Sequence, residues 1–124
     1  MTTAPWLIHV IDDDEPVRTS LLFALQTVGF QVNGYAEADA FLARGQADRS
    51  ILISDVRMPG MNGIELTRLL KKRGSTIPII LITGNANRTL HAEAMAAGAD
   101  ALLEKPTALQ VLLAEIARVT TERQ

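Results

Sequence analysis

Short apolar runs alternate with longer segments of helical spacing, and this alternation constrains the fold more than any other feature of the sequence. Runs rich in Val, Ile and Leu predict buried strands at Trp6–Ile11, Ile51–Ile53 and Ile79–Ile82, and weaker runs predict strands at Phe30–Tyr35 and Ala101–Leu103. Because these runs are continuously apolar rather than alternating, they are typical of a parallel sheet covered on both faces.

The segments between the runs carry the spacing of helices that bury one side. Three leucine-rich stripes repeat every three or four residues, an alanine-rich segment near 88–97 has high helix propensity, and a short helix is expected near Asp39–Leu42. Glycines follow three of these segments at positions typical of helix C-caps: Gly29, Gly74 and Gly98.

The order strand–helix, repeated five times, predicts a single α/β domain with a doubly wound, five-stranded parallel sheet. The length of 124 residues fits one domain, and a hydrophobic content of 48% is enough for a core. We find no linker, low-complexity stretch or sequence repeat that would divide the chain.

Charge and composition exclude several function classes. The net charge of −2 argues against direct nucleic-acid binding by this segment, and the lack of cysteine excludes disulfides, thiolate catalysis and cysteine zinc sites. The N-terminus lacks the pattern of a signal peptide, and no apolar run approaches the roughly 18 residues that span a bilayer. The sequence therefore predicts a soluble, cytoplasmic protein without a membrane partner.

Polar side chains follow the predicted strands where functional groups of such sheets gather, beyond the carboxyl ends. Asp12 and Asp13 follow the first strand, Asp55 the third, Thr83 the fourth and Lys105 the fifth. If the central strands are adjacent, three carboxylates, a hydroxyl and an ammonium converge in one shallow pocket.

This set of groups suits phosphoryl transfer. Three carboxylates near one point need a compensating cation, and Mg²⁺ prefers oxygen ligands together with water and phosphate. Lys105 and Thr83 would contact the phosphoryl oxygens, while one carboxylate acts as the nucleophile. Asp55 is the best candidate because it stands alone before a Pro/Gly-rich turn, whereas Asp12 and Asp13 suit metal ligation.

The run of four acids in "HVIDDDEP" then divides into two pairs. The first pair holds metal, and Asp14 or Glu15 caps the first helix or lies in its first turn, with Pro16 at the first helical position. Each site residue alone has a plainer explanation as a strand end, a turn or a solvated surface residue, and only the joint order favours a site. His9 and His91 lack such a context and are interpreted as structural or exposed.

Four motifs, "VIDDDEPVR", "ISDVRMPGMNG", "LITG" and "EKP", resemble the signatures of response-regulator receiver domains, and their wording is most similar to the FixJ-like subgroup. The resemblance covers nearly the whole chain. It implies the flavodoxin-like (βα)5 receiver fold, with a phosphoacceptor at Asp55 and with Thr83 and Lys105 contacting the phosphoryl group. It also implies Mg²⁺, for which Mn²⁺ or Ca²⁺ could substitute. The implied metal ligands are Asp13, Asp55 and the backbone carbonyl of Arg57, with Asp12 acting through water.

The resemblance also implies partners. A histidine kinase would donate the phosphoryl group, docking near Arg18–Leu22, and phosphorylation would switch the face formed by the helix near 88–97, the strand at 101–103 and the last helix, leading to a homodimer. The domain, residues 1–124, could be cut from a longer regulator with a C-terminal DNA-binding output domain beyond Gln124. Receivers often carry an aromatic residue three positions before the lysine, but here that position is Leu102, which puts ring-based switching in doubt.

Two rival functions match parts of the sequence. A haloacid-dehalogenase-like phosphatase also uses an aspartate and Mg²⁺, and Asp12-x-Asp14 superficially fits its opening motif. However, Pro16 stands where that motif has Thr or Val, and no late acidic pair follows the lysine. A nucleotide-binding domain is disfavoured because neither G-x-G-x-x-G nor G-x-x-x-x-G-K-[ST] occurs. The sequence thus favours a signalling switch over a turnover enzyme.

Overall fold

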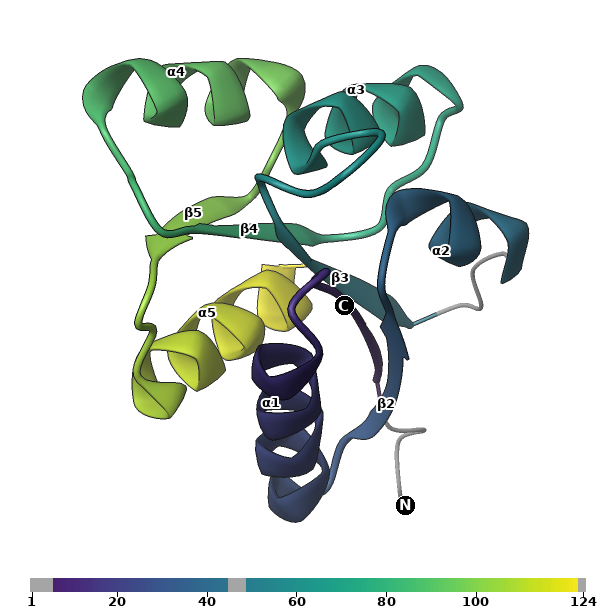
Figure 1. The fold of residues 1–124 in the computed structure, drawn as a ribbon, viewed down its shortest axis with the longest axis vertical. Coiled ribbons are helices and arrows are strands. Elements are labelled where there is room, and N and C mark those ends of the chain that lie inside the picture. Colours follow the sequence, from purple (N-terminus) through teal and green to yellow (C-terminus); the bar gives the residue numbers. More distant parts are fainter. Residues whose placement is uncertain (1–5, 45–48, 123–124) are drawn as a thin grey trace.

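One parallel sheet of five strands forms the centre of the protein in the computed structural model, which describes residues 6–44 and 49–122 (Figure 1). The strand order is β2-β1-β3-β4-β5. The bounds are β1 Leu7–Ile11, β2 Gln31–Tyr35, β3 Ser50–Asp55, β4 Ile79–Thr83 and β5 Ala101–Glu104. All four neighbouring pairs are parallel, so the predicted doubly wound fold is confirmed.

Helices cover both faces of the sheet (Figure 1). On one face lie α1 (Glu15–Val28) and α5 (Leu109–Glu122), and on the other lie α2 (Ala38–Arg44), α3 (Gly63–Lys72) and α4 (Arg88–Ala97). Within the described residues, no helix is long and apolar enough to span a membrane.

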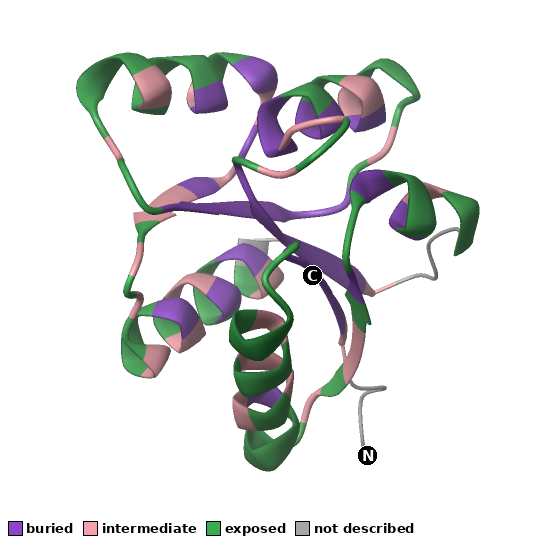
Figure 2. Cartoon of the chain, in the orientation of Figure 1, coloured by how far each residue is buried: buried purple, intermediate pink, exposed green. Residues whose placement is uncertain are grey.

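The central strands are buried on both sides, as the continuous apolar runs predict (Figure 2). Every residue of β3 and β4 is buried. Because successive strand residues point to opposite faces, Ile51 and Ile53 pack under α1 and α5, whereas Leu52 packs under α2, α3 and α4. In these two strands, polar groups can therefore meet solvent only beyond the buried stretch, near the strand ends.

Helix ends follow the expected capping chemistry with two differences. The Asp14 side chain accepts a hydrogen bond from the backbone N–H of Val17 and so caps α1, as expected. Since Glu15 takes the first helical position, Pro16 is the second helical residue rather than the first, and the ring is tolerated because N–H groups of the first turn have no partner within the helix. Gly74 is left-handed one residue beyond the Arg73 cap of α3.

His9 is a buried structural residue, as interpreted from the sequence. Its Nδ1 lies 2.9 Å from the Tyr35 hydroxyl and its Nε2 lies 3.3 Å from the Ser50 hydroxyl, while its ring packs edge-on against Phe41. Burial and the positive charge of Arg44 lower the pKa of His9 from 6.5 to about 4. His9 therefore links three strands as a neutral imidazole, whereas His91 is exposed on α4.

Candidate functional site

The strand order brings the predicted site residues to one edge of the sheet. Strand β2 lies on one side of β1 and β3 lies on the other, so the connections after β1 and after β2 run in opposite directions across the sheet. This makes a topological switch point between β1 and β3. In the β1–β3 ladder Ile11 pairs with Ser54, so the next residues, Asp12 and Asp55, lie level with one another. Asp55 is the last residue of β3 and Thr83 the last of β4, rather than the residues that follow those strands.

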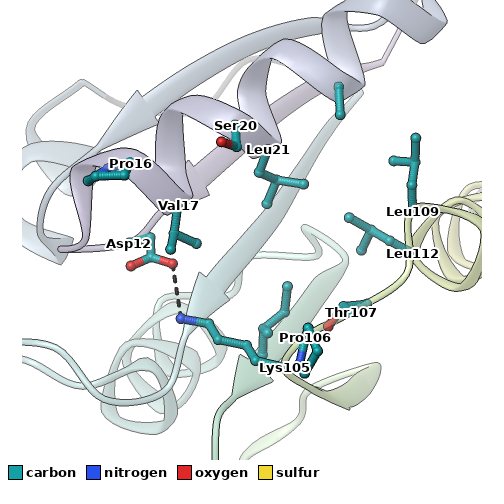
Figure 3. A pocket seen from close by; sticks show the side chains of 12 residues that line it. Asp12, Pro16, Val17, Ser20, Leu21, Lys105, Pro106, Thr107, Leu109 and Leu112 are labelled. Carbon is teal, nitrogen blue, oxygen red and sulfur yellow. Dashed lines mark hydrogen bonds and ion pairs between the residues drawn. The ribbon is translucent and has the colours of Figure 1, made fainter.

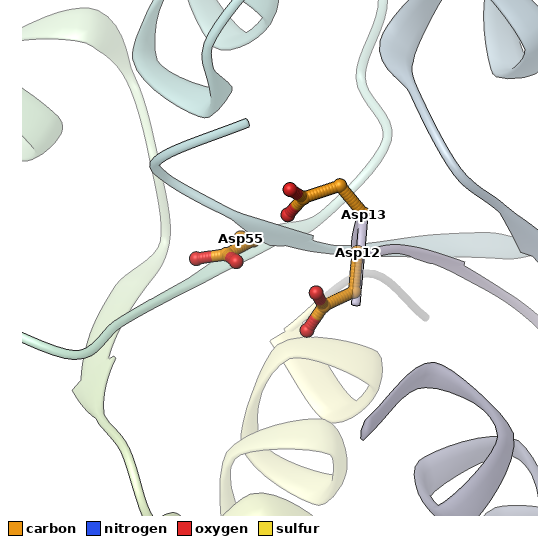
Figure 4. A group of neighbouring side chains, drawn as sticks. All are labelled: Asp12, Asp13 and Asp55. Atoms are coloured by element: carbon orange, nitrogen blue, oxygen red, sulfur yellow. The ribbon is translucent and has the colours of Figure 1, made fainter. Parts of the chain in front are cut away.

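Three aspartates form an acidic cluster at this edge: Asp12, Asp13 and Asp55 (Figure 4). Each offers a carboxylate oxygen, and these oxygens all lie within 4.8 Å of one another. Asp12 and Asp55 are buried, whereas Asp13 is exposed. A set of oxygen donors with one side open to water fits a hard cation such as Mg²⁺, which keeps part of its hydration shell.

Lys105 crosses from the end of β5 to the same cluster. Its Nζ lies 3.0 Å from Oδ2 of Asp55 and 3.1 Å from Oδ2 of Asp12, and Figure 3 shows the second of these contacts. The structure therefore brings the lysine and the proposed phosphoacceptor into direct contact, as the convergence of strand ends predicts.

Burial and the neighbouring charges act in opposite directions on these groups. Burial raises the pKa of Asp55, and the charges of Asp12 and Asp13 raise it further, although the hydrogen bond and charge of Lys105 oppose both. Burial disfavours the ammonium of Lys105, but hydrogen bonds to Asp55 and Asp12 and the charges of these carboxylates outweigh it and raise the pKa of Lys105. At this edge, three carboxylates therefore face one ammonium.

Asp12 has every polar group engaged. Its N–H donates to the carbonyl of Tyr35 (3.1 Å), and its own carbonyl accepts from Arg18 Nη1 (2.7 Å). Its Oδ1 accepts from the N–H of Asp14 (2.9 Å) and its Oδ2 from Lys105 (3.1 Å). These four bonds fix the position of Asp12 beside Asp55, and its water-mediated role stays a prediction.

Thr83 is buried at the end of β4, and its place at the site comes from the register. Ile82 pairs with Asp55 in the β3–β4 ladder, and Thr83 pairs with Glu104, the residue before the lysine. The Thr83 hydroxyl accepts a hydrogen bond from the N–H of Asn85 (3.3 Å) in the loop before α4. The hydroxyl is therefore tied to the loop that is expected to move on activation.

Gly63 is a site residue that the sequence did not reveal. It opens α3 directly against the end of β3, where its N–H donates to the carbonyl of Val56 (2.9 Å). A Cβ at Gly63 would lie 2.5 Å from the carbonyl oxygen of Asp55, which is too close for any other residue. Arg57 lies between these two elements with an exposed side chain, and the use of its carbonyl as a ligand stays a prediction.

Fold and site together define a class: flavodoxin-like α/β domains with an acidic, cation-suited pocket and a lysine at the carboxyl edge of the sheet. The comparison with protein families then identifies the family. The model of the response regulator receiver domain matches residues 8–117, and the chain belongs to this family. The family match supports the receiver interpretation of the sequence and gives no support to the phosphatase alternative.

Similar proteins agree with this assignment. The chain is 46% identical over 100 residues to the transcriptional regulatory protein FixJ of Azorhizobium caulinodans, which covers 80% of this chain and 47% of that protein. The crystal structure of FixJ-N matches with a TM-score of 0.88 and 40% identity, covering 96% of both chains. Full-length FixJ from B. japonicum matches with a TM-score of 0.86 and 41% identity, covering 98% of this chain and 60% of that one. The chain thus spans about half the length of the curated FixJ protein it matches.

Proposed function

We propose that this domain is a phosphorylation switch of a two-component system, in which Asp55 accepts a phosphoryl group from a histidine kinase. The observation that carries the proposal is the buried Asp55 carboxylate, held 3.0 Å from the Lys105 ammonium within a cluster of three aspartates. A carboxylate oxygen of Asp55 attacks phosphorus, the bond from phosphorus to the donor atom breaks, and the donor leaves with the electron pair.

Side chains around Asp55 would stabilise the charge that builds up on the transferred group. Lys105 turns from the Asp55 carboxylate to a phosphoryl oxygen, since its ammonium already lies within hydrogen-bond distance of the reacting group. Thr83 donates its hydroxyl proton to another oxygen, because in the structure this hydroxyl only accepts from the N–H of Asn85. Thr83 thereby links the new phosphoryl group to the loop before α4.

The acidic cluster would hold Mg²⁺, with Mn²⁺ or Ca²⁺ as substitutes. Asp13 and Asp55 would be direct ligands together with the carbonyl of Arg57, while Asp12 would act through water. When bound, the ion neutralises the carboxylates and the incoming phosphoryl oxygens. The exposed position of Asp13 leaves room for the water molecules that Mg²⁺ retains.

The kinase would dock on a groove between α1 and α5 (Figure 3). This groove has a volume of about 630 Å³, and Val17, Leu21 and Leu112 form part of its apolar lining. Asp12 and Lys105 line its end, so the groove is continuous with the phosphoacceptor pocket. A kinase helix seated there could present its phosphohistidine to Asp55. A cytoplasmic location follows from this partner and is part of the proposal.

The output of the switch would be conformational. We expect α4, β5 and α5 to form the face that changes and binds a second receiver, and a DNA-binding domain beyond Gln124 would use the dimer to control transcription. Leu102 of β5 is half-buried and packs against the core under α4, so coupling would run through this packing rather than through a rotating ring. Sedimentation with and without a phosphoryl mimic tests the dimer, and an unchanged mass would contradict it.

Intact-mass measurement tests the chemistry and the site together. Treatment with a small phosphodonor and Mg²⁺ should add one phosphoryl group to the wild type and none to Asp55→Asn, while Asp39→Asn, an exposed acid on α2, should label like the wild type. On p-nitrophenyl phosphate the domain should not cycle, because a switch is labelled once and releases phosphate slowly. Labelling of Asp55→Asn, or rapid turnover, would contradict the proposal.

A further inference from the structure

Arg18 connects helix α1 to the loop that carries the acidic cluster. Its guanidinium Nη1 lies 2.7 Å from the carbonyl oxygen of Asp12, the shortest bond that Asp12 makes. Among the described residues Arg18 forms no ion pair, so its half-buried charge is directed at a main-chain group. A charged donor at this distance makes a strong hydrogen bond.

The carbonyl of Asp12 needs such a partner because the sheet ends there. The β1–β2 ladder reaches its last pair at Ile11 and Tyr35, and the N–H of Asp12 still donates to the carbonyl of Tyr35. Its carbonyl has left the ladder and accepts from Arg18 instead. Since the peptide unit is planar, fixing this carbonyl also fixes the N and Cα of Asp13, so the Asp13 side chain leaves the chain from a fixed point.

Strand β2 makes room for this arrangement. A Cβ at Gly34 would lie 2.5 Å from Cδ1 of Leu22 and 3.4 Å from Cδ of Arg18. The glycine therefore makes room for Leu22 of α1, and the stem of Arg18 passes beside it at ordinary van der Waals distance on its way to Asp12. Glycine in a strand often marks such a close approach.

We propose that Arg18 is a positioning residue for the cation site: it holds the Asp12–Asp13 peptide so that the Asp13 carboxylate is aimed at the metal. The inference rests on the metal site of the proposed function. The direction in which metal affinity changes when Arg18 is replaced is informative, because a guanidinium close to a cation site repels the cation. Removing that charge alone would strengthen metal binding, so weaker binding after its removal must come from lost positioning.

Metal affinity, measured without any reaction, tests this inference. Mn²⁺ is titrated into the wild type, Arg18→Met, Arg18→Lys and the control Arg68→Met, and the free ion is followed by EPR. Arg68 is an exposed residue of α3 without a contact to the site. We expect affinity to fall about tenfold in Arg18→Met, as is typical when an outer partner of a metal ligand is removed, and about threefold in Arg18→Lys. Arg68→Met should match the wild type.

Phosphorylation separates positioning from a general loss of structure. At saturating Mg²⁺ the rate of labelling by a small phosphodonor should stay within about threefold in Arg18→Met, while the Mg²⁺ concentration for half-maximal rate rises about tenfold. Unchanged or tighter Mn²⁺ binding in Arg18→Met would overturn the inference. If that variant does not fold, Arg18→Lys decides, because the shorter side chain keeps the charge but changes the position of the donor, and an affinity equal to that of the wild type would overturn the inference. Failure of the wild type to bind Mn²⁺ would instead overturn the proposed metal site itself.

Discussion

His9 makes the stability of this domain sensitive to mild acid. The imidazole is 1% exposed, and burial together with the charge of Arg44 lowers its pKa from 6.5 to about 4. A histidine whose pKa is lowered on folding stays neutral in the folded chain while the unfolded chain takes up a proton. As pH falls below 6.5 the unfolded state therefore binds more protons, and the free energy of unfolding decreases until the pH reaches about 4.

The size of the effect follows from the two pKa values. The gap between 6.5 and about 4 corresponds to about 3 kcal/mol in full, of which about 2 kcal/mol is lost between pH 7 and pH 5. That is a large share of the 5–15 kcal/mol by which folded proteins are typically stable. Protonation would also make both ring nitrogens donors, so the hydroxyl that now donates to the ring, of Tyr35 or Ser50, would have to accept instead.

Urea unfolding at pH 5, 6 and 7, followed by the fluorescence of Trp6, measures this loss. Because Asp55 has a raised pKa and acts in the opposite direction, the informative quantity is the difference between the wild type and His9→Gln at each pH. From pH 7 to pH 5 the difference in the free energy of unfolding should shift by about 2 kcal/mol in favour of His9→Gln. The control His91→Gln, at an exposed position, should show the same dependence of unfolding free energy on pH as the wild type. Parallel profiles of the wild type and His9→Gln would refute the reasoning.

Three further predictions concern the carboxyl edge of the sheet. Gly63→Ala should lower the free energy of unfolding by about 1–3 kcal/mol, because the new Cβ meets the carbonyl oxygen of Asp55. Gly84→Ala is the control: open space surrounds Gly84, so the free energy of unfolding should change by less than about 0.5 kcal/mol. Equal urea midpoints for the two variants would count against this prediction. Lys105→Met should bind Mn²⁺ more tightly, since the ammonium no longer competes for Asp55, yet it should label poorly with a phosphodonor; weaker binding would contradict the competition. Mg²⁺ at ten times its dissociation constant should stabilise the wild type by about 1.4 kcal/mol but leave Asp13→Asn nearly unchanged, as thermal unfolding can check.

Apolar runs predicted the strands well but not their bounds. The pattern places the third strand at Ile51–Ile53, whereas β3 extends over Ser50–Asp55. Ser50 and Ser54 are polar yet buried, and the Ser54 hydroxyl donates to the carbonyl of Asp55. A polar residue that finds a local partner can continue a buried strand, and hydrophobicity alone does not register this.

Helix starts were likewise set by polar caps more than by apolar spacing. The leucine stripe of α3 begins at Leu66, but the helix begins at Gly63 because Asn62 and Glu65 form a reciprocal capping box. The stripe marks only the side of the helix that faces the core. The meeting of Asp12, Asp55 and Lys105 at one edge of the sheet was predictable, because parallel strands all end at the same edge.

The contacts that the sequence did not reveal act on main-chain groups where strands stop. A strand end leaves N–H and C=O groups without ladder partners, and which groups these are depends on the register between strands far apart in the sequence. Because the last β1–β2 pair is Ile11 and Tyr35, the carbonyl of Asp12 has no partner in that ladder, and Arg18 supplies one from α1, one helical turn beyond Asp14. The spacing alone places Arg18 near this loop, but only the register shows that a carbonyl there lacks a partner. For an acidic motif that follows a strand, the register of the sheet therefore shows which flanking cations and glycines contact the main chain of the motif. These residues help to set where the carboxylates point.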